Sequence, residues 1–522
     1  MRGITLGLTL TTVLLGCSGS DAPGPLPPPS DLTVSTTSPT TAMLQWAAPS
    51  DGDAGTVIER RADGAEFAEV ATVERGTTAH LDSGLVPGGT YDYRARAGSA
   101  GSKFGKVATV TTPIDFHVVP GEDSSTPNGG AETPFETIQQ AAEFIDPAWT
   151  CEVVIHPGRH ELPDNVVLPG GASLTIQAGA TLALGSRVTF LATRPVTAQG
   201  TAKAPIVLTW LVPDEPWGVF VVSGAGADGT VFSDCIVEHG GFGAIGGIGY
   251  TGALSIFDAE ATVSRCTFRD NTGDDSLNIK RAYSLVEHCS FFGGNDALDF
   301  DGAPGEIAYN DFHDTANDCI DTGEGATPLV HFNYVENAGD KGVSIGEGAA
   351  PTVEHNVIVG SALGIAIKDS SEPVIAYNTL VGNQVGVIGY EGIDGLGGGR
   401  GTVRNSIIWG SVVADVQLFD GSTTVFEYNC IEDGWPGTGN ISAAAGCPDP
   451  LFHDPAAGDY HLQSQYGRWD PTGQNFVNDA ATSPCIDAGD PAGDYTLEPE
   501  PNGDRANLGA DGNTAEASRS AN

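Results

Sequence analysis

The chain has 522 residues, and its 67 acidic against 23 basic side chains give a net charge of −44. This charge repels phosphate backbones and anionic membrane surfaces, so it argues against nucleic acid as a partner. The length allows two or three domains, and 71 glycines with only 7% aromatic residues are typical of a chain that turns often.

Residues 1–16 are predicted to be a secretory signal peptide. Their apolar run from Ile4 to Leu15 is too short to cross a bilayer as a helix but long enough for a signal. The run ends in Leu14-Leu15-Gly16-Cys17, which resembles the bacterial lipobox. The resemblance implies lipidation of Cys17 and a lipid-anchored protein at the outer membrane or cell surface. An ordinary signal with a chance cysteine is the alternative. Residues 17–26 are predicted to form a tether.

Residues 27–113 are predicted to form a β-sandwich. Six short runs alternate apolar and polar residues and are separated by turn residues. Trp46 on the second run and Tyr91 at the start of the fifth resemble the core tryptophan and corner tyrosine of fibronectin type III domains. The resemblance implies a spacer or binding module.

A short helix is predicted to seal the first end of the following domain. Thr133-Pro134-Phe135-Glu136 has the form of a capping box with proline at the first helical position. The apolar stripe that follows includes Ile138 and Ala141. Such a plug covers the unpaired strand edges and the core of a first coil.

Residues 115–445 carry the pattern that decides the predicted fold. A motif of alternating apolar and polar residues returns every 21 to 23 residues between Ala261 and Tyr390, a period typical of solenoids built from strands. The fold class is therefore all-β, with a parallel β-helix in which like residues stack about 4.8 Å apart. One column of the stack resumes at Asn405 and Asn429, and before them it contains Cys266, Cys289, Asn310, Asn333, Asn356 and Asn378.

Carboxylates gather around one turn of these repeats. Asp299 and Asp301 point to the same face of a strand, and Asp321 is expected one coil above Asp299. Two such charges about 4.8 Å apart repel by roughly 3.5 kcal/mol at an effective dielectric near 20. A bound Ca²⁺, a raised pKa on one carboxyl, or side chains that spread into water would each relieve this repulsion. A second column, with a spacing of 22 residues, contains Asp296, Asp318 and Asp340.

The series DALDFD, DCIDT, DKGVSIGE and GIAIKDSS resembles the right-handed parallel β-helix repeats of the pectate-lyase-like superfamily. That superfamily includes polysaccharide lyases, hydrolases and epimerases as well as surface proteins of unknown activity. Its calcium-dependent lyases hold the ion with clustered acidic residues and remove a proton with Lys or Arg. The resemblance implies as metal ligands Asp299, Asp301, Asp321 and Glu324. It implies as candidate catalytic bases Lys280, Lys341 and Lys368.

Three functions stay open at this stage, because neither a complete lyase motif nor the paired-aspartate signature of polygalacturonase-type hydrolases is present. A surface lipoprotein could use the β-helix to bind or process extracellular polysaccharide. It could instead be a calcium-dependent lyase or epimerase of uronate polymers, or a non-catalytic adhesive rod. The candidates for stacking on sugar rings are Tyr390, Trp409 and Phe419.

Residues 446–511 are predicted to close the second end of the solenoid. Their motifs SPCIDAGDP and NLGA closely resemble the final segment of bacterial surface β-helix proteins called choice-of-anchor Q. That segment usually ends in an aromatic residue, where this chain has Asp511. Residues 512–522 are predicted to be disordered. Cys430 and Cys447 flank a loop of about 17 residues and form a predicted disulfide in an oxidising compartment.

Overall fold

The computed structural model describes residues 25–47, 54–122 and 126–521. The predicted signal peptide and Cys17 lie outside the described residues. The chain divides into two compact units between Pro113 and Ile114. None of the helices in the described ranges is long and apolar enough to cross a membrane.

The first unit is a β-sandwich, as predicted. Tyr93 and Trp46 are buried in its core, and the hydroxyl of Tyr91 accepts a hydrogen bond of 2.8 Å from the amide of Val86. This bond ties the chain before β6 to the strand itself, the structural role predicted for Tyr91. One sheet contains β1 (Ser30–Ser38), β2 (Thr41–Ala47) and β5 (Ala79–Ser83), and the other contains β4 (Ala68–Val73), β3 (Thr56–Ala62), β6 (Thr90–Ala97) and β7 (Ala108–Thr111).

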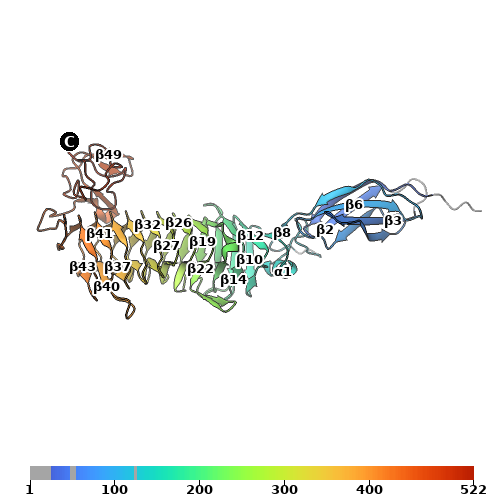
Figure 1. Cartoon of the computed structure of the whole chain (residues 1–522), viewed down its shortest axis with the longest axis horizontal. Coiled ribbons are helices and arrows are strands. Elements are labelled where there is room, and N and C mark those ends of the chain that lie inside the picture. Colours follow the sequence, from blue (N-terminus) through green and yellow to red (C-terminus); the bar gives the residue numbers. More distant parts are fainter. Residues whose placement is uncertain (1–24, 48–53, 123–125, 522) are drawn as a thin grey trace, which may run out of the picture. The chain divides into compact units, whose positions relative to one another are not determined.

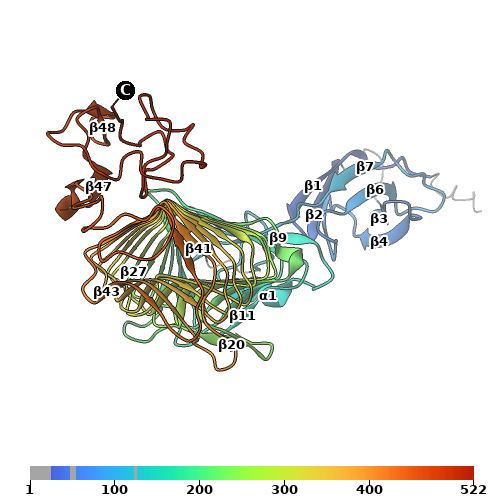
Figure 2. The ribbon, with the colours of Figure 1, turned by 60° about the vertical axis from the view of Figure 1, so that its left-hand side comes forward.

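The second unit is a parallel solenoid whose coils contribute strands in turn to three sheets (Figures 1 and 2). The β8 sheet contains β8 (Asp115–Val118), β9 (Cys151–Ile155), β12 (Ala172–Gln177), β15 (Val196–Gln199), β18 (Thr230–Ser233), β23 (Ala261–Ser264), β26 (Ser284–Glu287), β29 (Gly305–Ala308), β32 (Leu329–His331), β35 (Thr352–Glu354), β38 (Val374–Ala376), β41 (Thr402–Arg404) and β44 (Val425–Glu427).

The strands of the other two sheets also follow one another in chain order. The β10 sheet contains β10 (Gly158–Leu162), β13 (Ala180–Leu184), β16 (Ile206–Trp210), β19 (Cys235–Glu238), β24 (Thr267–Arg269), β27 (Ser290–Phe292), β30 (Asp311–His313), β33 (Tyr334–Glu336), β36 (Val357–Val359), β39 (Thr379–Val381), β42 (Ile407–Trp409) and β45 (Cys430–Ile431). The β11 sheet contains β11 (Val166–Val167), β14 (Phe190–Ala192), β17 (Phe220–Ser223), β22 (Gly252–Phe257), β25 (Asp275–Lys280), β28 (Asp296–Asp301), β31 (Ile320–Gly323), β34 (Lys341–Ile345), β37 (Leu363–Lys368), β40 (Val385–Tyr390) and β43 (Ala414–Leu418).

Helix α1 (Ile138–Phe144) packs against the first coils, as expected for a plug. Its N-cap is Thr137, whose side chain accepts from the amide of Gln140 while the Gln140 side chain accepts from the Thr137 amide. The predicted cap at Thr133 is therefore wrong by four residues. Thr133 instead donates to the side chain of Asn128 in the preceding turn.

A column of amides runs along the turn between the β8 and β10 sheets. The backbone N–H of Asn333 donates to Asn356 Oδ1, and the N–H of Asn356 donates to Asn378 Oδ1, each at 3.0 Å. This is the predicted stacked column, and it satisfies polar groups that would otherwise be buried without partners. Its continuation differs from the prediction, because Ser406 and not Asn405 takes the next position.

Two projections rise from the side of the solenoid (Figures 1 and 2). One is the hairpin of β20 (Gly243–Ile245) and β21 (Ile248–Tyr250). The other is the orange loop of residues 391–401 that follows β40. Both are glycine-rich segments attached to strands of the β11 sheet, so they flank the outward face of that sheet.

The segment after β45 lies along the side of the last coils. His355 Nδ1 donates to the carbonyl of Ala510 at 2.9 Å, and the Ala510 amide donates to Thr379 Oγ1 at 2.9 Å. The segment was predicted to close the end of the solenoid, whereas it packs against these lateral turns and against Ile407 and Cys430 of the β10 sheet. It contains β46 (Phe452–Asp454), β47 (Asp459–Leu462), β48 (Arg468–Asp470) and β49 (Asn475–Val477).

Residues 512–521 differ from the disordered tail predicted for 512–522. Ala517 is fully buried and Ser518 is 4% exposed. Ser518 Oγ donates to the carbonyl of Leu462, and Asn507 Nδ2 donates to the carbonyl of Ser518. Hydrogen bonds to distant residues hold this segment in place, and polar composition alone does not reveal them.

Candidate functional site: the outward face of the β11 sheet

Carboxylates form two columns on the outward face of the β11 sheet. Asp275 pairs with Asp296 across neighbouring strands, and Asp299 pairs with Asp321. Phe300, the next residue of β28, is fully buried in the core, so the Asp299 side chain points outward. The register places Asp321 directly beside Asp299, as the spacing predicted.

The first column changes from acidic to basic at β34. Asp318 follows Asp296, but Lys341 takes the next position because this coil is one residue longer. Lys341 Nζ lies 3.2 Å from Asp318 Oδ1 and forms a second ion pair with Asp340. The prediction that Asp340 continues the column is therefore wrong. Its side chain neutralises Lys341 instead.

Two of the three predicted bases are held as ammonium ions. Lys280 pairs with Asp301, and its Nζ lies 3.6 Å from Glu324 Oε1. Burial lowers the pKa of Lys280 and Lys341, but the neighbouring carboxylates outweigh burial and raise both pKa values. Neither side chain is the unprotonated amine that proton removal requires.

The buried carboxyl groups of the two columns have raised pKa values. Asp275 is 5% exposed and Asp296 is 9% exposed. Burial, together with nearby negative charges, raises the pKa of each to about 7. Burial and the charges of Asp275 and Asp301 also raise the pKa of Asp299. Asp275 and Asp296 therefore do not spread into water, so a raised pKa or a bound cation must relieve the repulsion on these two carboxyl groups.

All four predicted metal ligands line one hollow of about 480 Å³, which is also lined by Lys368, Asp369, Tyr390 and residues of the 391–401 loop. Gly346 forms part of its floor, where a Cβ atom would come within 2.8 Å of Lys368 Cε. Lys368 has no ion pair with any residue in the described part of the chain. Of the three predicted bases, it alone lies in the hollow. The predicted ligands there are Asp299, Asp301, Asp321 and Glu324.

Among the described residues, a close group of three carboxylates differs from the predicted ligand set. One oxygen from each of Asp296, Asp318 and Asp321 lies within 4.8 Å of the other two. Asp296 and Asp318 were not among the predicted ligands, although their regular spacing was visible in the sequence. Asp321 belongs to both groups, so it joins the buried column to the hollow.

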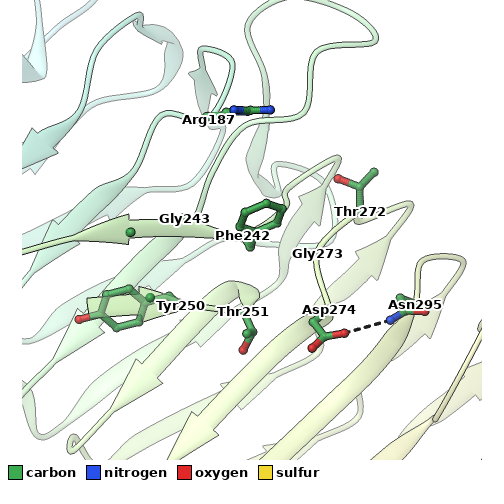
Figure 3. Close-up of a pocket in the computed structure, with 11 residues that line it drawn as sticks. Arg187, Phe242, Gly243, Tyr250, Thr251, Thr272, Gly273, Asp274 and Asn295 are labelled. Carbon is green, nitrogen blue, oxygen red and sulfur yellow. Dashed lines mark hydrogen bonds between the residues drawn. The ribbon is translucent and has the colours of Figure 1, made fainter. Parts of the chain in front are cut away.

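A second hollow, of about 960 Å³, lies beside the β20–β21 hairpin (Figure 3). Phe242 and Tyr250 line it, and Phe242 is 67% exposed. Asp274 and Asn295 also line this hollow, and Asn295 Nδ2 donates to Asp274 Oδ1 at 3.2 Å. The glycine-rich sequence 240–252 predicts a lateral loop of the kind that often shapes a cleft, but it does not show which residues line the hollow.

The three aromatic side chains predicted to stack on sugars are in different places. Tyr390 lines the acidic hollow. Trp409 packs against an apolar cluster formed with the C-terminal segment, and Phe419 is 51% exposed. Only Tyr390 is in a position to meet a ligand bound at the carboxylates.

The predicted disulfide partners Cys430 and Cys447 come together with a third cysteine. One sulfur from each of Cys430, Cys447 and Cys485 lies within 4.8 Å of the other two, and all three residues are buried. They are free thiols here, and the Sγ atoms of Cys447 and Cys485 are 3.5 Å apart. Spacing between neighbouring cysteines could not reveal Cys485, which approaches from a distant turn.

Two family models match parts of the chain. A model described as right handed beta helix region matches residues 218–392, and one described as disaggregatase related matches residues 401–489. The solenoid is a right-handed β-helix. A comparison with curated proteins gives no match.

Solved structures show slight likenesses to the chain. The Family 28 exopolygalacturonase of Yersinia enterocolitica is 13% identical over 79% of this chain and 88% of its own, with a TM-score of 0.32. An FN3 domain of human collagen XX is 19% identical over 18% of this chain and 100% of its own, with a TM-score of 0.16. The FN5 domain of Drosophila Lar is 22% identical over 17% of this chain and 97% of its own, with a TM-score of 0.15. We draw no functional conclusion from likenesses of this size.

Proposed function

We propose that the protein is a lipid-anchored surface protein whose β-helix binds an acidic extracellular polysaccharide through a divalent cation on the β11 sheet. The observation that carries this proposal is the hollow in which Asp299, Asp301, Asp321 and Glu324 converge. Ca²⁺ takes six to eight oxygen ligands. Four side chains leave positions free for the carboxylate and hydroxyl oxygens of a uronate polymer.

The chemistry of the hollow supports a cation more than direct recognition of an uncharged sugar. Asp299 and Asp321 are adjacent in register, and the nearest cation to Asp301, the Lys280 ammonium, is already shared with Glu324. A divalent ion would offset the remaining repulsion and would attract a polyanion to an otherwise acidic face. Tyr390 at the rim offers a ring on which a sugar can stack.

The test is retention of the purified chain on acidic polysaccharides with Ca²⁺ and with a chelator. We expect calcium-dependent retention on a uronate polymer, and its loss in the double variant Asp299→Asn and Asp321→Asn. Asp311→Asn, which removes an exposed carboxylate from the β10 sheet, is the matched control. Equal retention by the double variant and the control would remove the hollow from the binding site.

A lyase or epimerase is the second candidate, and Lys368 is the observation that favours it. Its amine lines the acidic hollow without a recorded ion pair among the described residues, so it is the predicted base best placed to remove a proton beside a bound carboxylate. Unsaturated products from a uronate polymer, abolished in Lys368→Met but not in Lys280→Met, would support the lyase. Binding without products would support the binding function alone. The absence of both binding and products would indicate an adhesive rod.

The lipid anchor belongs to the same proposal and rests on the lipobox-like sequence ending in Cys17. Lipidation at Cys17 would place the protein at the outer membrane or cell surface. We expect Cys17→Ser to move the protein from the membrane fraction to the soluble fraction. An unchanged distribution would exclude this anchor.

A further inference from the structure

The C-terminal segment brings together three polar groups that make no hydrogen bond with one another. His461 Nε2 lies 3.7 Å from Asp511 Oδ1 and 3.8 Å from Glu516 Oε2. The Nε2 atom is buried and has no hydrogen-bond partner among the described residues. Residues 462–510, which lie between His461 and Asp511, form irregular turns and two short hairpin strands, so only the folded segment creates this cluster.

The orientation of the His461 ring is set by a fourth residue. Asp459 Oδ1 lies 2.7 Å from His461 Nδ1 and also accepts from the His461 amide. A carboxylate that accepts from one ring nitrogen leaves the lone pair of the other nitrogen free to bind a metal, as in many metal sites. Here that nitrogen faces two carboxylates, and a lone pair opposite two negative charges is unfavourable without a cation between them.

The separations match the spacing around a small divalent ion. Metal–nitrogen and metal–oxygen bonds of about 2.1 Å in a tetrahedral arrangement place neighbouring ligand atoms about 3.4 Å apart. The two recorded distances are slightly longer than this and are too long for hydrogen bonds. His461 and Asp511 also line a hollow of about 440 Å³, which gives an ion and a further ligand a route to the cluster.

We propose that His461, Asp511 and Glu516 form a binding site for a divalent transition metal, with Asp459 positioning the histidine. One imidazole nitrogen with two carboxylates suits Mn²⁺ or Zn²⁺ better than Ca²⁺ or Mg²⁺, which prefer oxygen ligands alone. The site is separate from the carboxylates of the β11 sheet and does not depend on the proposed function. It also accounts for Asp511, the acidic residue found where the resembling C-terminal segments end in an aromatic side chain.

The competing explanation is a proton in place of the metal. Burial lowers the pKa of His461, but Asp511 and the other carboxylates outweigh burial and raise it to about 9. An imidazolium ion would then balance the cluster without any metal. Metal binding and its dependence on each carboxylate distinguish the two explanations.

The test uses Mn²⁺, because the buried thiols of Cys430, Cys447 and Cys485 would compete for Zn²⁺ but have little affinity for Mn²⁺. The full chain is titrated with Mn²⁺ in excess Ca²⁺, which occupies all-oxygen sites, and free Mn²⁺ is measured by electron paramagnetic resonance. We expect one saturable site per chain. Its affinity should fall at least about tenfold in Asp511→Asn and in Glu516→Gln, and about 10- to 100-fold in Asp459→Asn.

Asp454→Asn is the matched control, because Asp454 lines the same hollow but lies outside the cluster. Thermal unfolding with and without Mn²⁺ gives a second readout, in which the wild type and the control gain stability and the Glu516→Gln variant does not. Glu516 is half-exposed, so this variant is expected to fold. The absence of a saturable site, or equal affinity in Glu516→Gln and Asp454→Asn, would overturn the proposal.

Discussion

Replacing Asp275 by asparagine should stabilise the β-helix at neutral and alkaline pH. The carboxyl is buried, one of its oxygens has no hydrogen-bond partner among the described residues, and its pKa is raised to about 7 by burial and by the charges of Asp274, Asp301 and Asp321. The difference from the ordinary value of 3.8 corresponds to about 4 kcal/mol. A buried amide left without a partner costs about 2 kcal/mol, so the expected net gain is about 2 kcal/mol.

The sign of the pH dependence follows from the direction of the pKa change. Because the folded chain holds the Asp275 proton more tightly than the unfolded chain, wild-type stability falls as pH rises from about 4 to about 7 and stays low above that range. The net gain in Asp275→Asn should therefore appear at pH 8 and decrease as the pH falls, until near pH 4 mainly the cost of the unpartnered amide, about 2 kcal/mol, remains. Near pH 4 the folded-state carboxyl is protonated, and the unfolded-state carboxyl is close to its pKa of 3.8.

Urea unfolding followed by circular dichroism between pH 4 and 8, with a chelator present, measures this difference. Asp311→Asn, on the exposed face of the β10 sheet, is the control and should change stability by less than about 0.5 kcal/mol. A constant difference between Asp275→Asn and wild type across the pH range would refute the electrostatic reasoning. If Ca²⁺ binds the carboxylates around Asp275, adding it in place of the chelator should reduce the stability gain of Asp275→Asn.

Three further substitutions test the architecture by urea unfolding. Asn356→Ala removes the acceptor of two N–H groups in the preceding coil, and the free energy of unfolding should fall by about 3 to 5 kcal/mol. The surface change Asn295→Ala should lower it by less than about 0.5 kcal/mol. Equal losses would mean that the amide column does not stabilise the stack. Lys341→Met leaves Asp318, which is 3% exposed, without its cation. The free energy of unfolding should therefore fall by about 3 to 5 kcal/mol at pH 8 and by less at pH 4. A loss of stability that is independent of pH would contradict the ion pair. Gly342→Val places a Cβ atom within 2.7 Å of the Gly364 carbonyl oxygen and should cost at least about 1 to 3 kcal/mol; a neutral result would show that the coils can separate there.

The sequence predicted the coil spacing well because each repeat contributes one unit to the stack. Asn333, Asn356 and Asn378 fall in one column in both the pattern and the structure. The pattern failed where a coil gained a residue or a turn changed. Lys341 displaced Asp340 in a longer coil, and Ser406 displaced Asn405.

Side-chain pairing could be predicted only in part. Adjacent positions in a register follow from spacing, so Asp299 beside Asp321 was foreseeable. The partners of Lys280 and Lys341 were not, because a long side chain reaches any of several carboxylates around it. That choice depends on burial and on the shape of the turn.

The sequence by itself determined the all-β class, the parallel stack and the concentration of acid on one turn, since each follows from a short pattern repeated at a constant interval. Only the tertiary structure decided which carboxylates are buried and which lysine lies in the hollow. It also decided how His461 meets Asp511 and Glu516. The C-terminal segment has no repeat, so its contacts depend on the path of an irregular chain and not on spacing.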